Sequence, residues 1–337
     1  MSVDPALVEM MGAVFGEYRE KHPPGAAVQL DPELWSQLDE LGLVRLTGVE
    51  AHGGSGAGWY EAAELLSAAA GNGVRIPLAE HDLLGCWLLE AAGLPTDTAV
   101  RTMAVLNKQG EAAGVPWAVG ADRVVVVWRP EGGYRVADIP VGDLTVTPGT
   151  NLIGEPRDAV TADLAALSGE PVTLALVTEL RSKAALARAI QVCAALDRIV
   201  QLCIEHVTAR VQFGRPLSKF QAVQHMLSDI ASEATLARAA TEAALATAVS
   251  SGWSAFNLSF LVAAARSCAG HATSVVVRNA HQVHGAIGTT REHRLHEFTR
   301  AALAWRSEFG SMCYWDEQVT DAALHASAGG LWDLITG

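Results

Sequence analysis

The residues with the clearest chemical potential lie in one stretch, 209–221, which reads Ala-Arg-Val-Gln-Phe-Gly-Arg-Pro-Leu-Ser-Lys-Phe-Gln. Arg210 and Gln212 are two residues apart, and the aromatic Phe213 follows them directly. A guanidinium donates two parallel hydrogen bonds to a pyrophosphate, and a glutamine amide can add another. The N-terminus of the helix expected next also favours negative charge. The pattern therefore predicts an anion site.

The same stretch also has a purely structural interpretation, as a corner between two helices. Gly214 would end the first helix, and Pro216 would prevent it from continuing. Ser218 and Gln221 would form a capping box for the second helix. These features leave the arginine and the glutamine unexplained. The spacing by itself leaves both interpretations open.

Long amphipathic helices are expected to position this stretch. Apolar residues recur at three- and four-residue steps over 186–211, which predicts a helix about 40 Å long. Further helices are expected over 218–251, 257–283 and 291–310. Four long helices joined by short turns favour an antiparallel four-helix bundle, which with a tail would form a domain over 181–337.

The rest of the chain predicts a mainly α protein with a small β region. Residues 1–107 are rich in alanine and leucine at helical spacing, which predicts an N-terminal helical domain. Asp31, followed by a proline, is expected to cap one of its helices. Residues 108–180 form a reduced β domain, in which 123–128 and 172–177 are expected strands.

Composition excludes one broad class of function. The chain has 337 residues, 50% hydrophobic and 18% charged, and can bury a sizeable core as one large domain or two to three small ones. Its net charge of −13 comes from 24 basic and 37 acidic residues. General nucleic-acid binding needs a basic face, so no nucleic-acid partner is expected.

The cysteines and the N-terminal sequence indicate a cytoplasmic protein. The cysteines are odd in number, widely spaced and outside any C-x-x-C motif, as expected in a reducing compartment: Cys86, Cys193, Cys203, Cys268 and Cys313. The N-terminal sequence has no basic segment followed by an apolar one. Because no apolar run approaches the ~20 residues of a bilayer span, no membrane span is expected.

Histidines and arginines near the C-terminus form two further patterns. His281 with His284, and His293 with His296, are His-x-x-His pairs at helical spacing that could in principle bind a metal. No H-E-x-x-H motif or matched cysteine accompanies them, so no metal site is expected. A solvated helix face accounts for four arginines: Arg291, Arg294, Arg300 and Arg306.

Two motifs resemble those of the flavin-dependent acyl-CoA dehydrogenases. Arg-x-Gln-Phe-Gly-x-Pro-Leu-x-x-Phe-Gln in 209–221 is similar to the signature at the start of that family's C-terminal bundle. His-Gln-Val-His-Gly-Ala-Ile-Gly at 281–288 resembles the family's Gln-x-x-Gly-Gly-x-Gly segment, and Glu292, Leu295 and Arg300 fit the helix after it. The segment at 34–43 and the glycine-rich loop at 53–58 also resemble this family. The resemblance covers nearly the whole chain.

The resemblance implies a bound FAD, which in this family lies across a subunit interface. It implies that the pyrophosphate and adenine end of a neighbour's FAD contacts Arg210, Gln212 and Phe213. The same groove would be lined by Leu217, Phe220 and Gln221. The ADP portion would be approached by Gln282, Gly285 and Ala286. Ala286 departs from the family's usual glycine.

The family's catalytic base has no clear counterpart. Acyl-CoA dehydrogenases remove a proton alpha to a thioester with a glutamate beside a Gly-Thr pair at the end of the fourth bundle helix. An ungapped count from Gln282 places Phe309 there, with Glu308 one residue away and turned by about 100°. The alternative base position of some members falls on Ala184, with Glu179 close in sequence.

The resemblance therefore implies a subunit that serves a partner's flavin. The strands with threonine and tryptophan that hold the flavin ring in this family are not recognisable. A larger homologous subunit would supply them and the catalytic glutamate, as in the α2β2 acyl-CoA dehydrogenases of actinobacterial steroid catabolism. An acyl-CoA substrate, possibly steroid-derived, and an electron-transfer acceptor are implied. Two alternatives remain: a scaffold subunit without flavin, and a self-sufficient homomeric dehydrogenase with Glu308 as base.

Overall fold

The computed structural model describes residues 3–23 and 28–336 and divides the chain into two compact units. The first unit comprises Met1–Ala69 and Val74–Ala184, and the second comprises Ala70–Gly73 and Ala185–Gly337. The expected mainly α fold with a small β region and a C-terminal helical bundle is confirmed. The finer division into domains 1–107, 108–180 and 181–337 stays a prediction.

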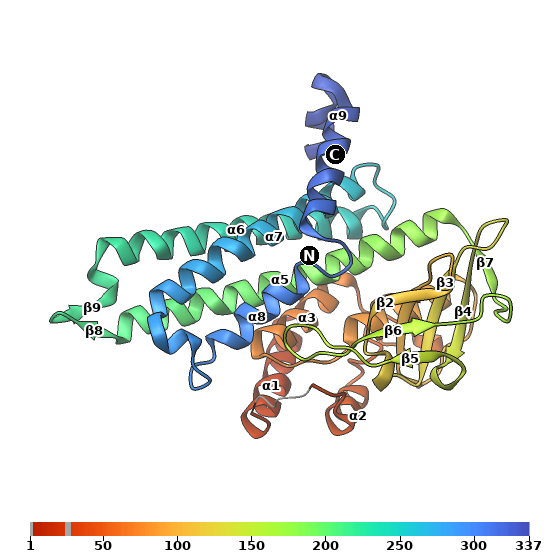
Figure 1. The fold of residues 1–337 in the computed structure, drawn as a ribbon, viewed down its shortest axis with the longest axis horizontal. Coiled ribbons are helices and arrows are strands. Elements are labelled where there is room, and N and C mark those ends of the chain that lie inside the picture. Colours follow the sequence, from red (N-terminus) through yellow and green to blue (C-terminus); the bar gives the residue numbers. More distant parts are fainter. Residues whose placement is uncertain (1–2, 24–27, 337) are drawn as a thin grey trace. The chain divides into compact units, whose positions relative to one another are not determined.

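Helices begin the first unit (Figure 1). They are α1 (Pro5–Lys21), α2 (Pro32–Glu40), α3 (Trp59–Asn72, whose last residues belong to the second unit), a π-helix (Ala79–Cys86) and α4 (Trp87–Ala91). Asp31 caps α2 as predicted, because its carboxylate accepts hydrogen bonds from the backbone N–H groups of Glu33 and Leu34. The π-helix is wholly buried.

Two small sheets follow in the same unit. One has the strand order β1 (Arg101–Val105), β3 (Arg123–Trp128), β4 (Tyr134–Pro140) and β7 (Glu170–Val172). The other has the order β2 (Glu111–Pro116), β6 (Arg157–Thr161) and β5 (Thr145–Thr147). β1 pairs with β3 in parallel, whereas the other pairs in both sheets are antiparallel. The predicted strand at 123–128 is confirmed, and its four consecutive valines are fully buried.

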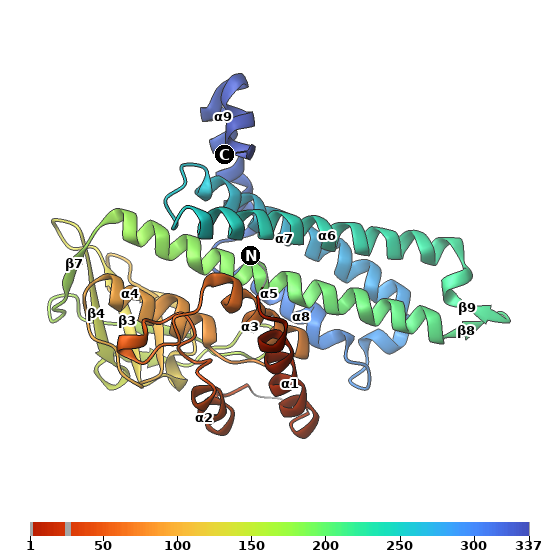
Figure 2. The same cartoon turned by 180° about the vertical axis from the view of Figure 1, so that it is seen from behind.

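Long helices dominate the second unit. They are α5 (Leu174–Ala209, which starts in the first unit), α6 (Gln221–Ser250), α7 (Leu258–His284), α8 (Leu295–Trp305) and α9 (Met312–Thr336). A hairpin of β8 (Val211–Gln212) and β9 (Arg215–Pro216) joins α5 to α6. In both views α6 and α7 lie side by side (Figure 2). The core of this bundle is rich in alanine, which lets the helices approach closely.

Three local predictions were wrong. The expected strand 172–177 keeps only Val172, because Thr173 Oγ1 accepts a bond from Leu176 N and starts α5 at Leu174. The predicted capping box does not form: Ser218 lies in a 3-10 turn (Leu217–Lys219), and the N-cap of α6 is Phe220, with no side-chain bond.

The fourth expected helix, 291–310, is the third error. The observed α8 is shorter (Leu295–Trp305) and follows a separate 3-10 turn (Gly285–Thr289), while α9 replaces the expected tail. Glycines at both breaks take positive φ values, 63° at Gly285 and 128° at Gly310, so the helix is interrupted at residues suited to that backbone.

One described helix is long and apolar enough, by length and composition, to cross a membrane. It spans Leu258–Thr289, and half of its most apolar window is buried inside the protein. The fully buried Arg266 also lies in this helix. These properties are those of a core helix.

Candidate functional site

The hairpin that carries the first motif is short and exposed. Val211 pairs with Pro216, and Gln212 pairs with Arg215. Between them Phe213 and Gly214 both have positive φ values, 51° and 79°, as a two-residue hairpin turn requires. The hairpin lies between the C-terminal end of α5 and the N-terminal end of α6 (Figure 1).

Two polar side chains at this hairpin, those of Arg210 and Gln212, have no partner among the described residues. Arg210 and Gln212 are exposed, and their side chains form no hydrogen bond or ion pair with any residue that the structure describes. Phe213 is 91% exposed, an unusual position for a large aromatic side chain. The fold of this chain therefore does not account for these groups.

Phe213 of the hairpin and Phe220, the N-cap of α6, form a small aromatic cluster. The rings of Phe213 and Phe220 meet edge to face with centroids 6.2 Å apart. Arg215 Cζ lies 4.2 Å from the centroid of the Phe220 ring, a cation–π contact. Leu217 N donates to Arg210 O at 2.9 Å, which ties the residues after the turn back to the end of α5. Gln221 is exposed as the first residue of α6.

The second motif lies at the end of α7. Gln282, Gly285 and Ala286 are all exposed. The alanine in place of the family's usual glycine therefore projects a methyl group at the surface rather than into the core. Gly288 is the glycine that the packing requires, because a Cβ there would lie 2.8 Å from His284 Cβ and 3.1 Å from Leu295 Cδ2.

The structure brings the two motifs to the same end of the bundle. The His206 ring, on the last turn of α5, stacks on His284 at the end of α7 with centroids 4.4 Å apart. Burial, the neighbouring His293 and the positive charge of Arg210 lower the pKa of His206. Arg210 thus acts electrostatically on a residue that touches the second motif.

The position expected for the catalytic base is occupied by a charge network. Phe309 has a positive φ of 54°, which is rare for a bulky residue. The Glu308 carboxylate accepts a hydrogen bond from Nε of the buried Arg188 at 2.7 Å. Arg188 Nη1 also donates to Gln191, and Arg188 Cζ lies 5.2 Å from the Phe309 ring. Proton abstraction by this Glu308 oxygen would have to break a buried ion pair.

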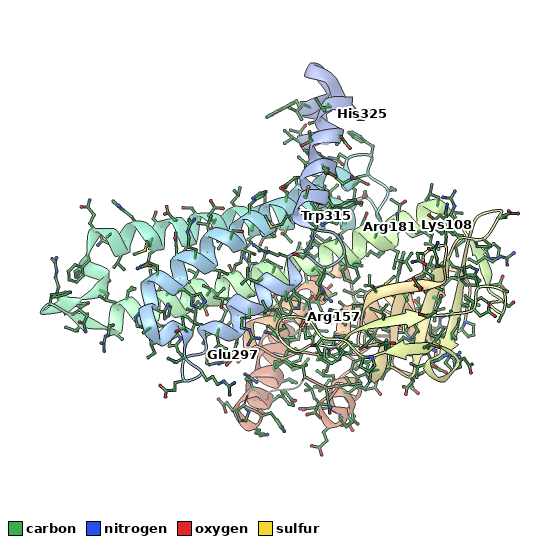
Figure 3. All side chains as sticks on the ribbon, viewed as in Figure 1. Lys108, Arg157, Arg181, Glu297, Trp315 and His325 are labelled. Carbon is green, nitrogen blue, oxygen red and sulfur yellow. The ribbon has the colours of Figure 1, made fainter. Side chains whose placement is uncertain are left out.

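A second arginine, Arg266, binds the backbone around Glu308. Arg266 is fully buried, and its Nη2 donates to the carbonyl oxygens of Arg306 at 3.0 Å and Glu308 at 2.7 Å. Burial and the nearby Arg188 lower its pKa to about 10. Trp315, at the start of α9, lies 5.9 Å from its Cζ (Figure 3). Two buried arginines, Arg188 and Arg266, therefore bind the segment around Phe309, where the resemblance places the catalytic base.

The alternative base position also lacks a free carboxylate. Ala184 is buried, and Glu179 pairs with Lys183 Nζ at 3.3 Å. Burial lowers the pKa of Lys183 to about 8, although the pairing with Glu179 opposes that shift. Its ammonium lies over Trp59 and Trp87, 5.0 Å and 4.4 Å from the ring centroids. The sequence analysis missed this lysine, because nothing in its local sequence marks it as buried.

The two expected histidine pairs are not the groups that the structure forms. His281 Nε2 lies 3.1 Å from Thr299 Oγ1, and His296 Nδ1 lies 2.8 Å from the carbonyl oxygen of His293. The structure instead groups His284 and His293 with His206. Sequence analysis missed His206, which is remote from the other two along the chain.

The residues of the hairpin fit an FAD diphosphate by their chemistry. A guanidinium and a carboxamide without partners in the described chain are suitable donors for phosphate oxygens. The exposed Phe213 ring offers an apolar face to an adenine. All three side chains are exposed and therefore accessible to a ligand.

Comparison with known proteins gives one family. Residues 176–312 match the family described as "Acyl-CoA dehydrogenase, C-terminal domain". "Acyl-CoA dehydrogenase IpdE2" of Mycolicibacterium smegmatis is 30% identical over 299 residues, which cover 84% of this chain and 88% of that protein.

Solved structures share the fold. A chain of the ChsE4-ChsE5 complex from Mycobacterium tuberculosis superimposes with a TM-score of 0.81 at 21% identity, covering 96% of this chain and 99% of that one. A variant of the Tcur3481-Tcur3483 steroid ACAD gives a TM-score of 0.80 at 20% identity, covering 96% and 98%.

Proposed function

Since the chain belongs to the acyl-CoA dehydrogenase family of FAD-dependent oxidoreductases, we propose that it is the non-catalytic subunit of a heteromeric acyl-CoA dehydrogenase. In this proposal it binds the ADP half of FAD, and a larger homologous subunit supplies the catalytic glutamate and the pocket for the flavin ring. The complex is an α2β2 heterotetramer in the cytoplasm.

One observation carries the proposal. Arg210 and Gln212, which the resemblance assigns to a neighbour's FAD, have no side-chain partner among the described residues, and an ungapped count assigns Phe309 to the position of the family's base. The nearest carboxylate, on Glu308, is already bound to Arg188 at 2.7 Å. A homomer of such chains would bind nucleotide without a free base.

Each residue of the hairpin has a distinct part in this proposal. Arg210 donates to the pyrophosphate, Gln212 adds a further donor, and Phe213 packs on the adenine end. Leu217, Phe220 and Gln221 line the groove, and from α7 the ADP portion is approached by Gln282, Gly285 and Ala286. When bound, FAD supplies the acceptor for the hydride that leaves the beta carbon of the acyl-CoA.

The names of the similar structures support the partner and the substrate. One is described as the ChsE4-ChsE5 complex. The other is described as the Tcur3481-Tcur3483 steroid ACAD, a name that joins two proteins. We therefore extend the proposal to a steroid-derived acyl-CoA as substrate, desaturated between its alpha and beta carbons. An electron-transfer protein would reoxidise the flavin.

Flavin content and turnover of separate and combined subunits test the proposal. The chain should be expressed alone, and with the homologous dehydrogenase subunit that co-purifies with it. The lone chain should show no stoichiometric flavin in its visible spectrum and no dehydrogenase activity. The co-purified complex should show both.

The alternatives predict different results. Stoichiometric flavin and turnover in the lone chain would mean a self-sufficient enzyme with Glu308 as base and would overturn the proposal. A complex in which the flavin content does not depend on Arg210 would favour a scaffold subunit that binds no flavin.

A further inference from the structure

Three histidines from separate segments meet at the end of the helical bundle. His206 lies on the last turn of α5, His284 is the last residue of α7, and His293 lies in the loop before α8. One ring nitrogen from each lies within 4.8 Å of the other two. We propose that His206, His284 and His293 bind one divalent transition-metal ion of the zinc, cobalt or nickel class.

His284 is the best prepared of the three ligands. Its Nδ1 lies 2.8 Å from the carbonyl oxygen of Ala280, so Nδ1 carries the proton and donates to that oxygen. Nε2 is therefore an unprotonated lone pair. It is buried and has no hydrogen-bond partner among the described residues. Metal-binding histidines usually donate their other ring N–H to a carbonyl or carboxylate oxygen, which fixes the tautomer and the ring orientation.

The two other rings are close enough to join His284. The centroid of the His284 ring lies 4.4 Å from that of His206 and 4.6 Å from that of His293. Both partner side chains are only half-buried, so they can turn. Ligand nitrogens on a tetrahedral zinc lie about 3.3 Å apart, given Zn–N distances of about 2.05 Å. The rings must therefore close by roughly an ångström or more from their observed positions.

His293 must change one hydrogen bond on binding. Its Nδ1 now accepts from Leu295 N at 3.1 Å, which leaves the proton on Nε2. Coordination through Nε2 moves this proton to Nδ1 and gives up the bond from Leu295. This cost makes His293 the weakest of the three ligands.

The surroundings favour neutral imidazoles, which are the form that binds metal. Burial is the main cause that lowers the pKa of all three histidines, and it brings that of His284 to about 4. Burial thus disfavours the protonated form of each ring.

The donor set decides the class of metal. Imidazole nitrogens suit zinc, cobalt, nickel and copper, whereas magnesium and calcium prefer oxygen. The nearby thiol of Cys203 lies 4.0 Å from His284 Nδ1, on the side of the ring that faces away from the free nitrogen, so it is not a fourth ligand. Three protein ligands leave one position for water or for an external group.

A bound ion would join the ends of α5 and α7 to the loop before α8. Arg210 directly follows α5, Gln282 lies in the last turn of α7, and Gly285 and Ala286 follow α7. The metal would therefore hold the two parts of the proposed nucleotide site together. The metal site itself does not depend on that proposed function.

Metal titration of the full chain, after chelation and removal of any affinity tag, tests the proposal. If the chain co-purifies with a partner, the complex is titrated. Zn²⁺ should bind with one ion per chain in calorimetry, and Co²⁺ should give the visible absorption of a low-coordinate site. His206→Gln and His293→Gln should each weaken binding about 100-fold or more, because they remove a ligand and not just its support.

His225→Gln provides the matched control, because it removes an exposed histidine of α6 outside the cluster. This variant should bind like the unaltered chain. Absence of Zn²⁺ and Co²⁺ binding in the unaltered chain, or binding that survives both cluster variants, would overturn the proposal. Neither outcome bears on flavin content, which is measured separately.

Discussion

Two regions of the second unit hold charged side chains in opposite ways. Around Glu308 the buried Arg188 and Arg266 are engaged by a carboxylate, an amide and several carbonyl oxygens of the same chain. At the β8–β9 hairpin, Arg210 just before β8 and Gln212 within it are exposed and have no side-chain partner among the described residues. The charges of the first region are engaged within this chain, whereas the exposed groups of the second are free to meet a ligand.

The difference distinguishes charged side chains that folding requires to be paired from charged side chains that folding does not explain. A buried charge must be paired, since desolvation otherwise costs several kcal/mol, so the network at Glu308 follows from folding alone. An exposed arginine needs no partner for stability. Folding alone therefore does not explain why the hairpin combines a guanidinium, a carboxamide and a 91% exposed phenylalanine.

The largest expected effect comes from breaking the buried network. Arg188→Leu removes the arginine that pairs with the Glu308 carboxylate and should lower the free energy of unfolding by about 3–5 kcal/mol in urea denaturation. Arg198→Leu, which removes a more exposed arginine from the same helix, should cost less than about 1 kcal/mol. Adding Glu308→Leu to Arg188→Leu should restore much of the loss. Equal effects of the two single substitutions would contradict the assignment.

Lys183 extends the comparison to the first unit. Burial lowers its pKa from 10.5 to about 8, so the unfolded chain binds more protons than the folded one between these values. Stability should therefore rise as the pH increases through this window, by on the order of 3 kcal/mol. Lys183→Met should remove this rise, whereas Lys108→Met, at an exposed lysine, should keep it. Denaturation midpoints at several pH values provide the measurement.

On the exposed side, Arg210→Ala should affect the cofactor and not the fold. Loss of a charge-assisted hydrogen bond of about 1.5–3 kcal/mol should weaken FAD binding to the assembled complex about 10- to 100-fold. The denaturation midpoint of this chain should stay unchanged. Lys219→Ala removes an equal charge from the same exposed loop and should leave FAD affinity nearly unaltered. Equal losses from both variants would indicate general electrostatics instead of a specific contact.

The smallest effect is expected from Glu308→Gln. Because this carboxylate is engaged by Arg188, the substitution should change the turnover of the assembled complex by less than about twofold. Steady-state kinetics would show this directly. A loss of several orders of magnitude, with the complex still assembled, would make Glu308 the base.

The sequence predicted what depends on local pattern. The cap at Asp31, the strand at 123–128 and the first three long helices of the bundle follow from residue type and spacing, and the structure confirms them. The motif at 209–221 also lies on a corner between helices as expected. The nucleotide-binding roles of its residues stay a prediction.

The errors arose where contacts between residues far apart in the sequence determine the local structure. Ser218 has the sequence of a capping box, but the backbone bond from Leu217 N to Arg210 O holds the preceding residues in a hairpin, and a 3-10 turn takes its place. His206 joins His284 and His293 only after α5 and α7 have packed. The ion pair of Arg188 with Glu308 likewise joins residues 120 positions apart.

A structure of the assembled complex with FAD tests the central claim most directly. The account predicts the FAD pyrophosphate within hydrogen-bond distance of Arg210 and Gln212 of this chain, with the flavin ring held by the partner subunit. A complete complex in which no nucleotide contacts the β8–β9 hairpin, or in which the flavin ring lies in a pocket of this chain beside Glu308, would contradict it.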